Sequence, residues 1–189
     1  VEGQLKKYFA EQIKHATIAP EFIGIADLFT RISGVQPISN LPLLFEFYDC
    51  YTKTCKDTPD SFEEFLSWGQ TALKDFSEID QYLVNPDKIF PYIHALKEAE
   101  HWSGMDELSE MQKKHLAFWN SLGDYYFALN SKLTEMGKGY GGFIAKKAVE
   151  KLPKYLQTHT NTIHIFVGFN ALSKAEQHVI QSILMDIGG

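Results

Sequence analysis

The sequence predicts a mainly helical protein with a small α/β part, in which a helical lobe is attached to an incomplete parallel sheet. Apolar residues recur at spacings of three and four through most of the chain, which is the helical pattern. One segment, residues 163–167, is apolar on both faces and favours a strand buried in a parallel sheet. Because a lone strand cannot satisfy its own backbone groups, we expect the rest of the sheet outside this chain.

The first part of the chain predicts two helices with a short strand between them, and then a third helix. Residues 4–16 repeat apolar side chains every fourth position, and an N-terminal helix of this kind is expected in an internal piece of a larger protein. Residues 22–24 alternate like a short strand, and the helix after them is expected to end at Gly34. Residues 40–56 carry a wide apolar stripe and predict a mostly buried helix.

The middle of the chain predicts long helices with recognisable N-terminal signals. Ser61 and Glu64 form a capping-box pattern before a helix over residues 61–83, with a possible break near Ser77. A second such pattern, at Ser109 and Gln112, precedes the longest helix, which should end at Gly137. Three further helices are predicted at residues 87–101, 143–155 and 173–188.

Composition limits the class of protein. The 189 residues carry a net charge of −6, which argues against binding nucleic acid or membrane through the whole surface. Cys50 and Cys55 lie on different faces of one predicted helix, so free thiols are expected. No apolar run is long enough to cross a bilayer, and the first residues lack a signal-peptide pattern. A cytoplasmic protein without a membrane partner is therefore expected.

Three motifs suggest chemistry, and each has a simpler structural interpretation. Residues 137–142 read G-x-G-x-x-G but follow a helix rather than a strand, so a helix end and corner is the expected role. A helix would place His94, Glu98 and His101 on one side, as in half of a di-iron site, but a solvated face is favoured. The acidic cluster is Asp75, Glu78 and Asp80, and it lacks the E-x-K of a nuclease.

No cofactor, metal site or catalytic residue is therefore expected in this chain. A phosphate-binding loop with its lysine is absent from the sequence, which argues against ATP hydrolysis by this chain. One basic stretch remains as a candidate for contact with a DNA backbone, consisting of Lys138, Lys146, Lys147, Lys151 and Lys154. The alternative is that these lysines only keep the helix soluble.

The most specific part of the sequence is FVGFNALSKAE at residues 166–176. It resembles the VGF-x-x-L-x-x-x-E segment of AddB-like double-strand-break repair proteins, which include inactivated superfamily I helicases with a carboxy-terminal PD-(D/E)XK nuclease. Three other segments look like AddB segments in the same order, namely PEFIGIADLF at residues 20–29, FLSWGQTALKDFSEID at residues 65–80 and the predicted helix that contains Phe118, Trp119 and Leu133.

The resemblance implies a P-loop-helicase-like domain whose nuclease lies beyond Gly189. Residues 1–36 would be one edge of that domain, residues 37–157 a helical insert, and residues 158–189 a strand and helix that return to the domain. The parent protein would pair with an AddA-type helicase-nuclease and process DNA ends. The alternative is a stand-alone helical adaptor that binds another protein through its aromatic-rich helices.

Overall fold

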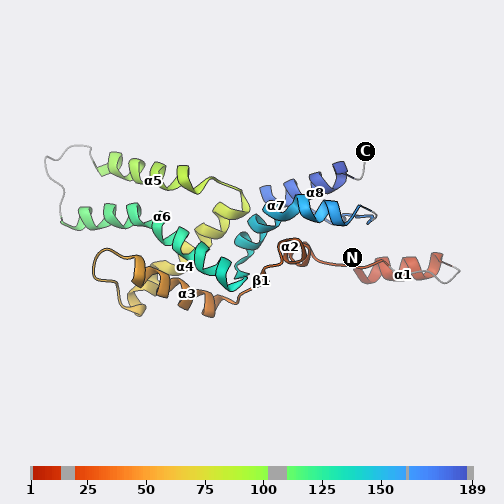
Figure 1. Ribbon diagram of the computed structural model, residues 1–189, viewed down its shortest axis with the longest axis horizontal. Coiled ribbons are helices and arrows are strands. Elements are labelled where there is room, and N and C mark those ends of the chain that lie inside the picture. Colours follow the sequence, from red (N-terminus) through yellow and green to blue (C-terminus); the bar gives the residue numbers. More distant parts are fainter. Residues whose placement is uncertain (1, 14–19, 102–109, 161, 187–189) are drawn as a thin grey trace.

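The computed structural model describes residues 2–13, 20–101, 110–160 and 162–186. Within these ranges the chain forms eight helices and two very short strands (Figure 1). The elements in order are α1 (Glu2–Gln12), α2 (Ile25–Ser33), β1 (Gln36–Pro37), α3 (Asn40–Thr54), α4 (Phe62–Gln81), α5 (Pro86–His101), α6 (Glu110–Met136), β2 (Lys138–Gly139), α7 (Gly141–Thr158) and α8 (Lys174–Asp186). The predicted mainly helical fold class is confirmed.

The helices form two packed groups joined through α4 and α7. In the first group α6 packs against both α3 and α5, and in the second α7 packs against both α2 and α8. Contacts between α4 and α7 connect the groups, whereas α1 extends away from the body (Figure 1). None of the helices in the described ranges has the length and apolar character that crossing a membrane requires.

Local signals explain where several helices begin and end. The Ser61 hydroxyl accepts a hydrogen bond from the Glu64 amide at 3.3 Å, and the Glu64 carboxylate accepts one from the Ser61 amide at 2.9 Å. The predicted capping box is therefore present. Gly34 ends α2 with a φ of 66°, in the left-handed region that glycine enters most easily. Helix α4 continues through Ser77, so the predicted break is wrong.

The other predicted helices are present with shifted ends. Helix α7 begins two residues earlier and ends three residues later than the predicted range 143–155. A second capping box, formed by Ser173 and Glu176, precedes α8. The capping pattern predicted at Ser109 and Gln112, and the ends of the predicted helices at residues 14–16 and 187–188, involve positions outside the described residues.

The sheet does not form where the sequence predicts it. Strands β1 and β2 pair in parallel, and the Gln36 amide donates to the Gly137 carbonyl at 3.0 Å. Residues 163–167, expected to be central to whatever sheet the chain forms, take no part in the β1–β2 sheet, so that expectation is wrong. The pairing of this segment with strands outside the chain stays a prediction. The strand predicted at residues 22–24 is also not formed. Without neighbouring strands, neither segment has a ladder to join.

An aromatic cluster forms the centre of the core. Phe47 is fully buried and contacts Phe65, Trp68 and Phe76 edge-to-face, with ring centroids 5.2, 5.9 and 5.6 Å apart. Such pairs contribute about 0.5–1.5 kcal/mol each beyond the area that they bury. Cys50 and Cys55, at the end of α3, are both free thiols, as predicted. The cluster joins α3 to α4 and so fixes the helix that carries the candidate site.

Candidate functional site

A buried carboxylate forms the centre of the candidate site. Asp80 lies in the last turn of α4, and only 1% of its surface is exposed. Its two oxygens accept hydrogen bonds from the Tyr126 hydroxyl, from the Tyr140 hydroxyl at 2.6 Å and from the Lys146 ammonium at 2.7 Å. The carboxylate is therefore both neutralised and hydrogen-bonded, as a buried charge must be.

Lys146 connects the same carboxylate to a fifth residue. Its ammonium lies 2.7 Å from Asp80, 2.8 Å from the Tyr126 oxygen and 2.8 Å from the Asn130 amide oxygen. An ammonium has three N–H donors, so these contacts use all of them. The Asn130 amide nitrogen in turn lies 3.5 Å from the Tyr140 oxygen. We call these five residues, Asp80, Tyr126, Asn130, Tyr140 and Lys146, the junction.

Burial keeps both junction tyrosines protonated. It raises the pKa of Tyr126, and the hydrogen bond to Asp80 raises that pKa further. Burial also raises the pKa of Tyr140, and the charge of Asp80 adds to this effect. Both phenols therefore act as hydrogen-bond donors rather than as bases. With every partner supplied by the chain itself, the junction is suited to holding helices together.

A glycine contact allows the helices to approach closely enough for the junction to form. The Gly142 amide, at the start of α7, donates to the Ser77 hydroxyl of α4 at 3.2 Å. A β-carbon on Gly142 would lie 2.8 Å from the Ser77 α-carbon and closer still to the Ser77 carbonyl oxygen. Only glycine fits there, and this fit brings Tyr140 and Lys146 to Asp80.

The structure separates the five lysines that the sequence groups together. Lys146 belongs to the junction, Lys147 pairs with Glu150 at 2.7 Å, and Lys151 donates to the Ser33 carbonyl of α2. Lys138 and Lys154 are exposed, and neither forms an ion pair within the described residues. Two of the five ammonium groups are thus available to an external anion.

The glycine run forms a corner, as predicted. Gly137 has a φ of 63° and ends α6, while Gly139 belongs to β2. A β-carbon on Gly139 would collide with the Phe143 ring, so this glycine also serves packing. The run therefore connects α6 to α7 through β2.

The acidic cluster divides into two environments. Asp80 is buried in the junction, whereas Asp75 and Glu78 are exposed and line a groove of about 370 Å³ between α4, α5 and α6. Partial burial of the carboxylate raises the pKa of Asp75, the charge of Glu78 raises it further, and the charge of Lys74 lowers it. We call this cavity the α4–α6 groove.

Nothing in the described residues groups the predicted histidines into a metal site. His94 has a buried Nδ1 atom without a hydrogen-bond partner, while the side chains of Glu98 and His101 lie outside the described part. Across the residues that the structure describes, no group of three or more His, Cys, Asp or Glu side chains is placed to hold a metal ion.

An extended segment over residues 162–169 exposes an apolar face. Ile163 and Ile165 are 82% and 75% exposed, and Val167 points outward as well. The alternating residues His164 and Phe166 are half-buried, and the His164 ring lies 2.9 Å from the Tyr155 hydroxyl. The segment therefore has one face against the protein and one apolar face open to solvent.

Sequence reasoning missed three members of the junction. Tyr126 and Asn130 are four residues apart on α6 and therefore lie on the same face of the helix. Both are polar, whereas most other residues on that face are apolar. Tyr140 lies between Gly139 and Gly141, and the glycine pattern indicates a corner without assigning a role to the tyrosine. A search for polar residues at otherwise apolar helical positions would have found the first two.

The chain was also compared with known proteins. No family model matches it, and no match was found among the curated proteins or the solved structures.

Proposed function

We propose that the chain is a non-catalytic, helicase-like part of a DNA double-strand-break repair helicase-nuclease subunit, where it acts as a scaffold. The junction supports the scaffold part of this proposal most directly, whereas the helicase-like part rests on the resemblance of residues 166–176. Asp80 and Lys146 form an ion pair at 2.7 Å, and their hydrogen bonds join α4, α6 and α7. When the polar groups of a site form their hydrogen bonds within the fold, a structural role is favoured over catalysis.

The exposed segment over residues 162–169 supports contact with further protein, which by the resemblance would be the rest of a P-loop-helicase-like domain. Ile163, Ile165 and Val167 present apolar surface that the described residues leave uncovered. Solvent-exposed β-branched side chains on an unpaired extended segment favour contact with further protein. The parent protein would then pair with an AddA-type helicase-nuclease and act on DNA.

Contact with the DNA backbone is proposed for the two available lysines. Lys138 and Lys154 are exposed, whereas Lys146, Lys147 and Lys151 already have partners within the chain. Lysine neutralises phosphate without reading base edges, so little sequence preference is expected.

The salt dependence of DNA binding tests this proposal. In the protein that carries this chain, Lys138→Gln with Lys154→Gln should reduce the slope of log affinity against log salt by roughly 1.4 to 1.8. Lys53→Gln with Lys132→Gln gives the same change of charge on α3 and α6, where both lysines pair with carboxylates. If the slope of log affinity against log salt is the same for both variants, Lys138 and Lys154 do not contact DNA. ATP turnover that is abolished by a substitution within this chain, without a change in the free energy of unfolding, would contradict the non-catalytic role.

A second candidate is a helical adaptor that binds another protein. The α4–α6 groove favours it, because apolar side chains on α5 continue beyond the groove into solvent. A parent reading frame with a nuclease motif would favour the first candidate. A reading frame without one would favour the adaptor.

A further inference from the structure

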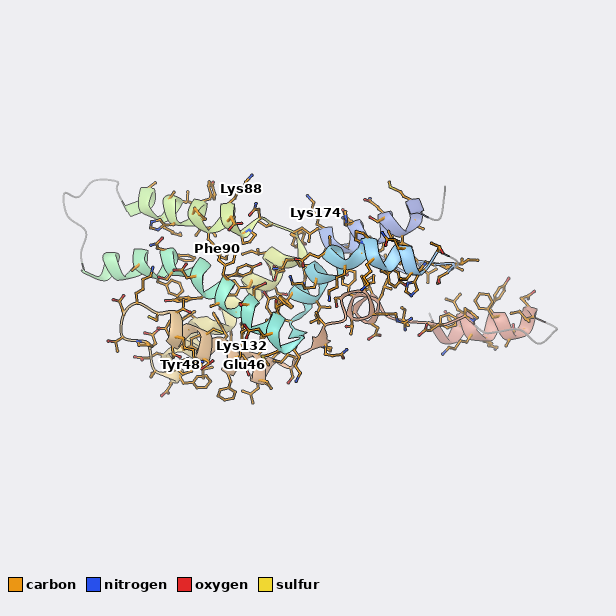
Figure 2. All side chains as sticks on the ribbon, in the orientation of Figure 1. Glu46, Tyr48, Lys88, Phe90, Lys132 and Lys174 are labelled. Atoms are coloured by element: carbon orange, nitrogen blue, oxygen red, sulfur yellow. The ribbon has the colours of Figure 1, made fainter. Side chains whose placement is uncertain are left out.

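The α4–α6 groove is a preformed apolar cavity between three helices. It has a volume of about 370 Å³, and its apolar walls come from all three helices and from the turn between α4 and α5. The main apolar lining residues are Phe76, Ile79, Val84, Ile89, Ile93 and Trp119. Figure 2 shows Phe90 between α5 and α6, and this buried ring both lines the groove and belongs to the hydrophobic core.

The apolar surface of the groove continues along α5. Ile89, Ile93 and the exposed Tyr92 and Leu96 are spaced i, i+4, i+3 and i+7, so they share one helical face. Tyr92 is 63% exposed and Leu96 is 45% exposed. The open apolar surface is thus longer than a compact small molecule would cover, and its shape is that of a strip parallel to a helix.

Charge distinguishes this strip from an ordinary apolar patch. Asp75 and Glu78 lie one turn apart on α4 and line the groove, and neither forms an ion pair within the described part of the chain. Partial burial and the charge of Glu78 raise the pKa of Asp75, and the nearby charge of Lys74 offsets part of this effect. A cation placed at this edge would relieve the repulsion.

We propose that the α4–α6 groove and the α5 strip together bind a basic amphipathic helix of a partner protein. Apolar side chains of the partner at i, i+3, i+4 and i+7 would fill the groove and cover Tyr92 and Leu96, while a flanking lysine or arginine would face Asp75 and Glu78. Docking here does not require a role in DNA repair, so its failure would leave the scaffold proposal standing.

The test uses a fluorescein-labelled Leu/Lys peptide of roughly 18 residues, which is about five helical turns. Fluorescence anisotropy with the full chain measures its binding. A peptide of the same pattern with Glu in place of Lys tests charge, and a scrambled Leu/Lys peptide tests helical amphipathicity. We expect the Leu/Lys peptide to bind, and the Leu/Glu and scrambled peptides to show no binding at the same concentration.

Two variants locate the binding. Asp75→Asn with Glu78→Gln should weaken binding about fivefold, as expected for two partly exposed ion pairs. Glu63→Gln with Glu135→Gln makes the same change in net charge at two other exposed carboxylates, and should have little effect. Leu96→Asp should weaken binding more than about tenfold by placing a charge in the apolar contact. The control is Leu184→Asp, on α8, where the leucine is also exposed.

Specific results would overturn the proposal. Equal binding of the Lys and Glu peptides would mean that charge is not recognised, and equal losses in the two carboxylate variants would mean that only net charge matters. Self-association of the chain that Leu96→Asp abolishes would assign the strip to a second copy. Binding of a small apolar dye, displaced by neither peptide, would assign the groove to a small molecule.

Discussion

Helix α4 presents carboxylates in two contrasting environments only five residues apart. Asp80 is buried and accepts hydrogen bonds from two tyrosines and a lysine, whereas Asp75 is exposed at the edge of an apolar groove beside a second acid. The first carboxylate is a component of the fold, and the second lacks an internal partner. The comparison shows that the surroundings of an acidic residue, rather than its place in an acidic cluster, decide whether it pairs within the fold or stays open to an external cation.

The largest effect is expected from breaking the junction. Lys146→Met leaves the Asp80 carboxylate buried without a cation, and Asp80→Asn leaves the ammonium without an anion. Each should reduce the free energy of unfolding by about 3–5 kcal/mol. Urea denaturation followed by circular dichroism measures the loss. The double variant should cost much less than the sum, because neither charge remains unpaired. Additive losses would contradict direct coupling.

Adding a side chain at the close contact between α4 and α7 should have the next largest effect on stability. A methyl group at Gly142 would overlap the Ser77 backbone, so Gly142→Ala should destabilise the protein by about 1–3 kcal/mol. The neighbouring Gly141 has open space at its β position, so Gly141→Ala should be neutral or slightly stabilising. Thermal denaturation compares the two. An equal response would mean that α7 can shift without cost.

The junction tyrosines predict a loss of stability in alkali. The pKa of Tyr140 is raised in the folded protein, so its contribution is complete below the unfolded value of about 10 and declines as pH rises above it. Removing one such group by Tyr140→Phe should make this decline shallower by about 1.4 kcal/mol per pH unit. Urea midpoints between about pH 9 and 11 measure it. Tyr82→Phe, at a residue 55% exposed, is the control. Equal slopes would contradict the prediction.

The helices were predictable because their signals are local. The capping box of Ser61 and Glu64 and the left-handed Gly34 each act within one turn. The sheet was not predictable in the same way. Residues 163–167 have strand composition but no neighbouring strand among the described residues, whereas the paired strands contain Pro37 and Gly139, which are poor strand formers. The packing of α7 against α2 brings these two segments together.

The junction depends on contacts between distant residues. Asp80 and Lys146 are 66 residues apart, and the sequence suggested an acidic cluster for one and a DNA-contacting face for the other. Their pairing requires the corner at Gly137 and the close approach at Gly142. No single segment contains that information, because it arises from how three helices pack.

The smallest effect, and the sharpest contrast with Asp80, is expected at Asp75. Burial and the charge of Glu78 raise its pKa, so the folded state holds the proton more tightly than the unfolded state. That contribution is fully present below the unfolded pKa of about 3.9 and is lost as pH rises through the folded pKa. At pH 7 the ionised carboxylate is therefore a small cost. Because Asp75 is exposed and solvent screens its charge, Asp75→Asn should raise stability there only slightly, by at most about 0.5 kcal/mol, opposite in sign to Asp80→Asn.

The role proposed for Asp75 is tested by comparing the stability of the parent chain and Asp75→Asn with and without the Leu/Lys peptide. Without it, urea midpoints should show the Asn variant slightly more stable than the parent chain at pH 7, with the difference disappearing near pH 4. With saturating peptide this advantage of the Asn variant should disappear or reverse, because a bound cation then favours the ionised carboxylate and the parent chain gains more from binding. If the advantage is as large with peptide bound as without it, the cation does not face Asp75, and the orientation proposed for the docked helix is wrong.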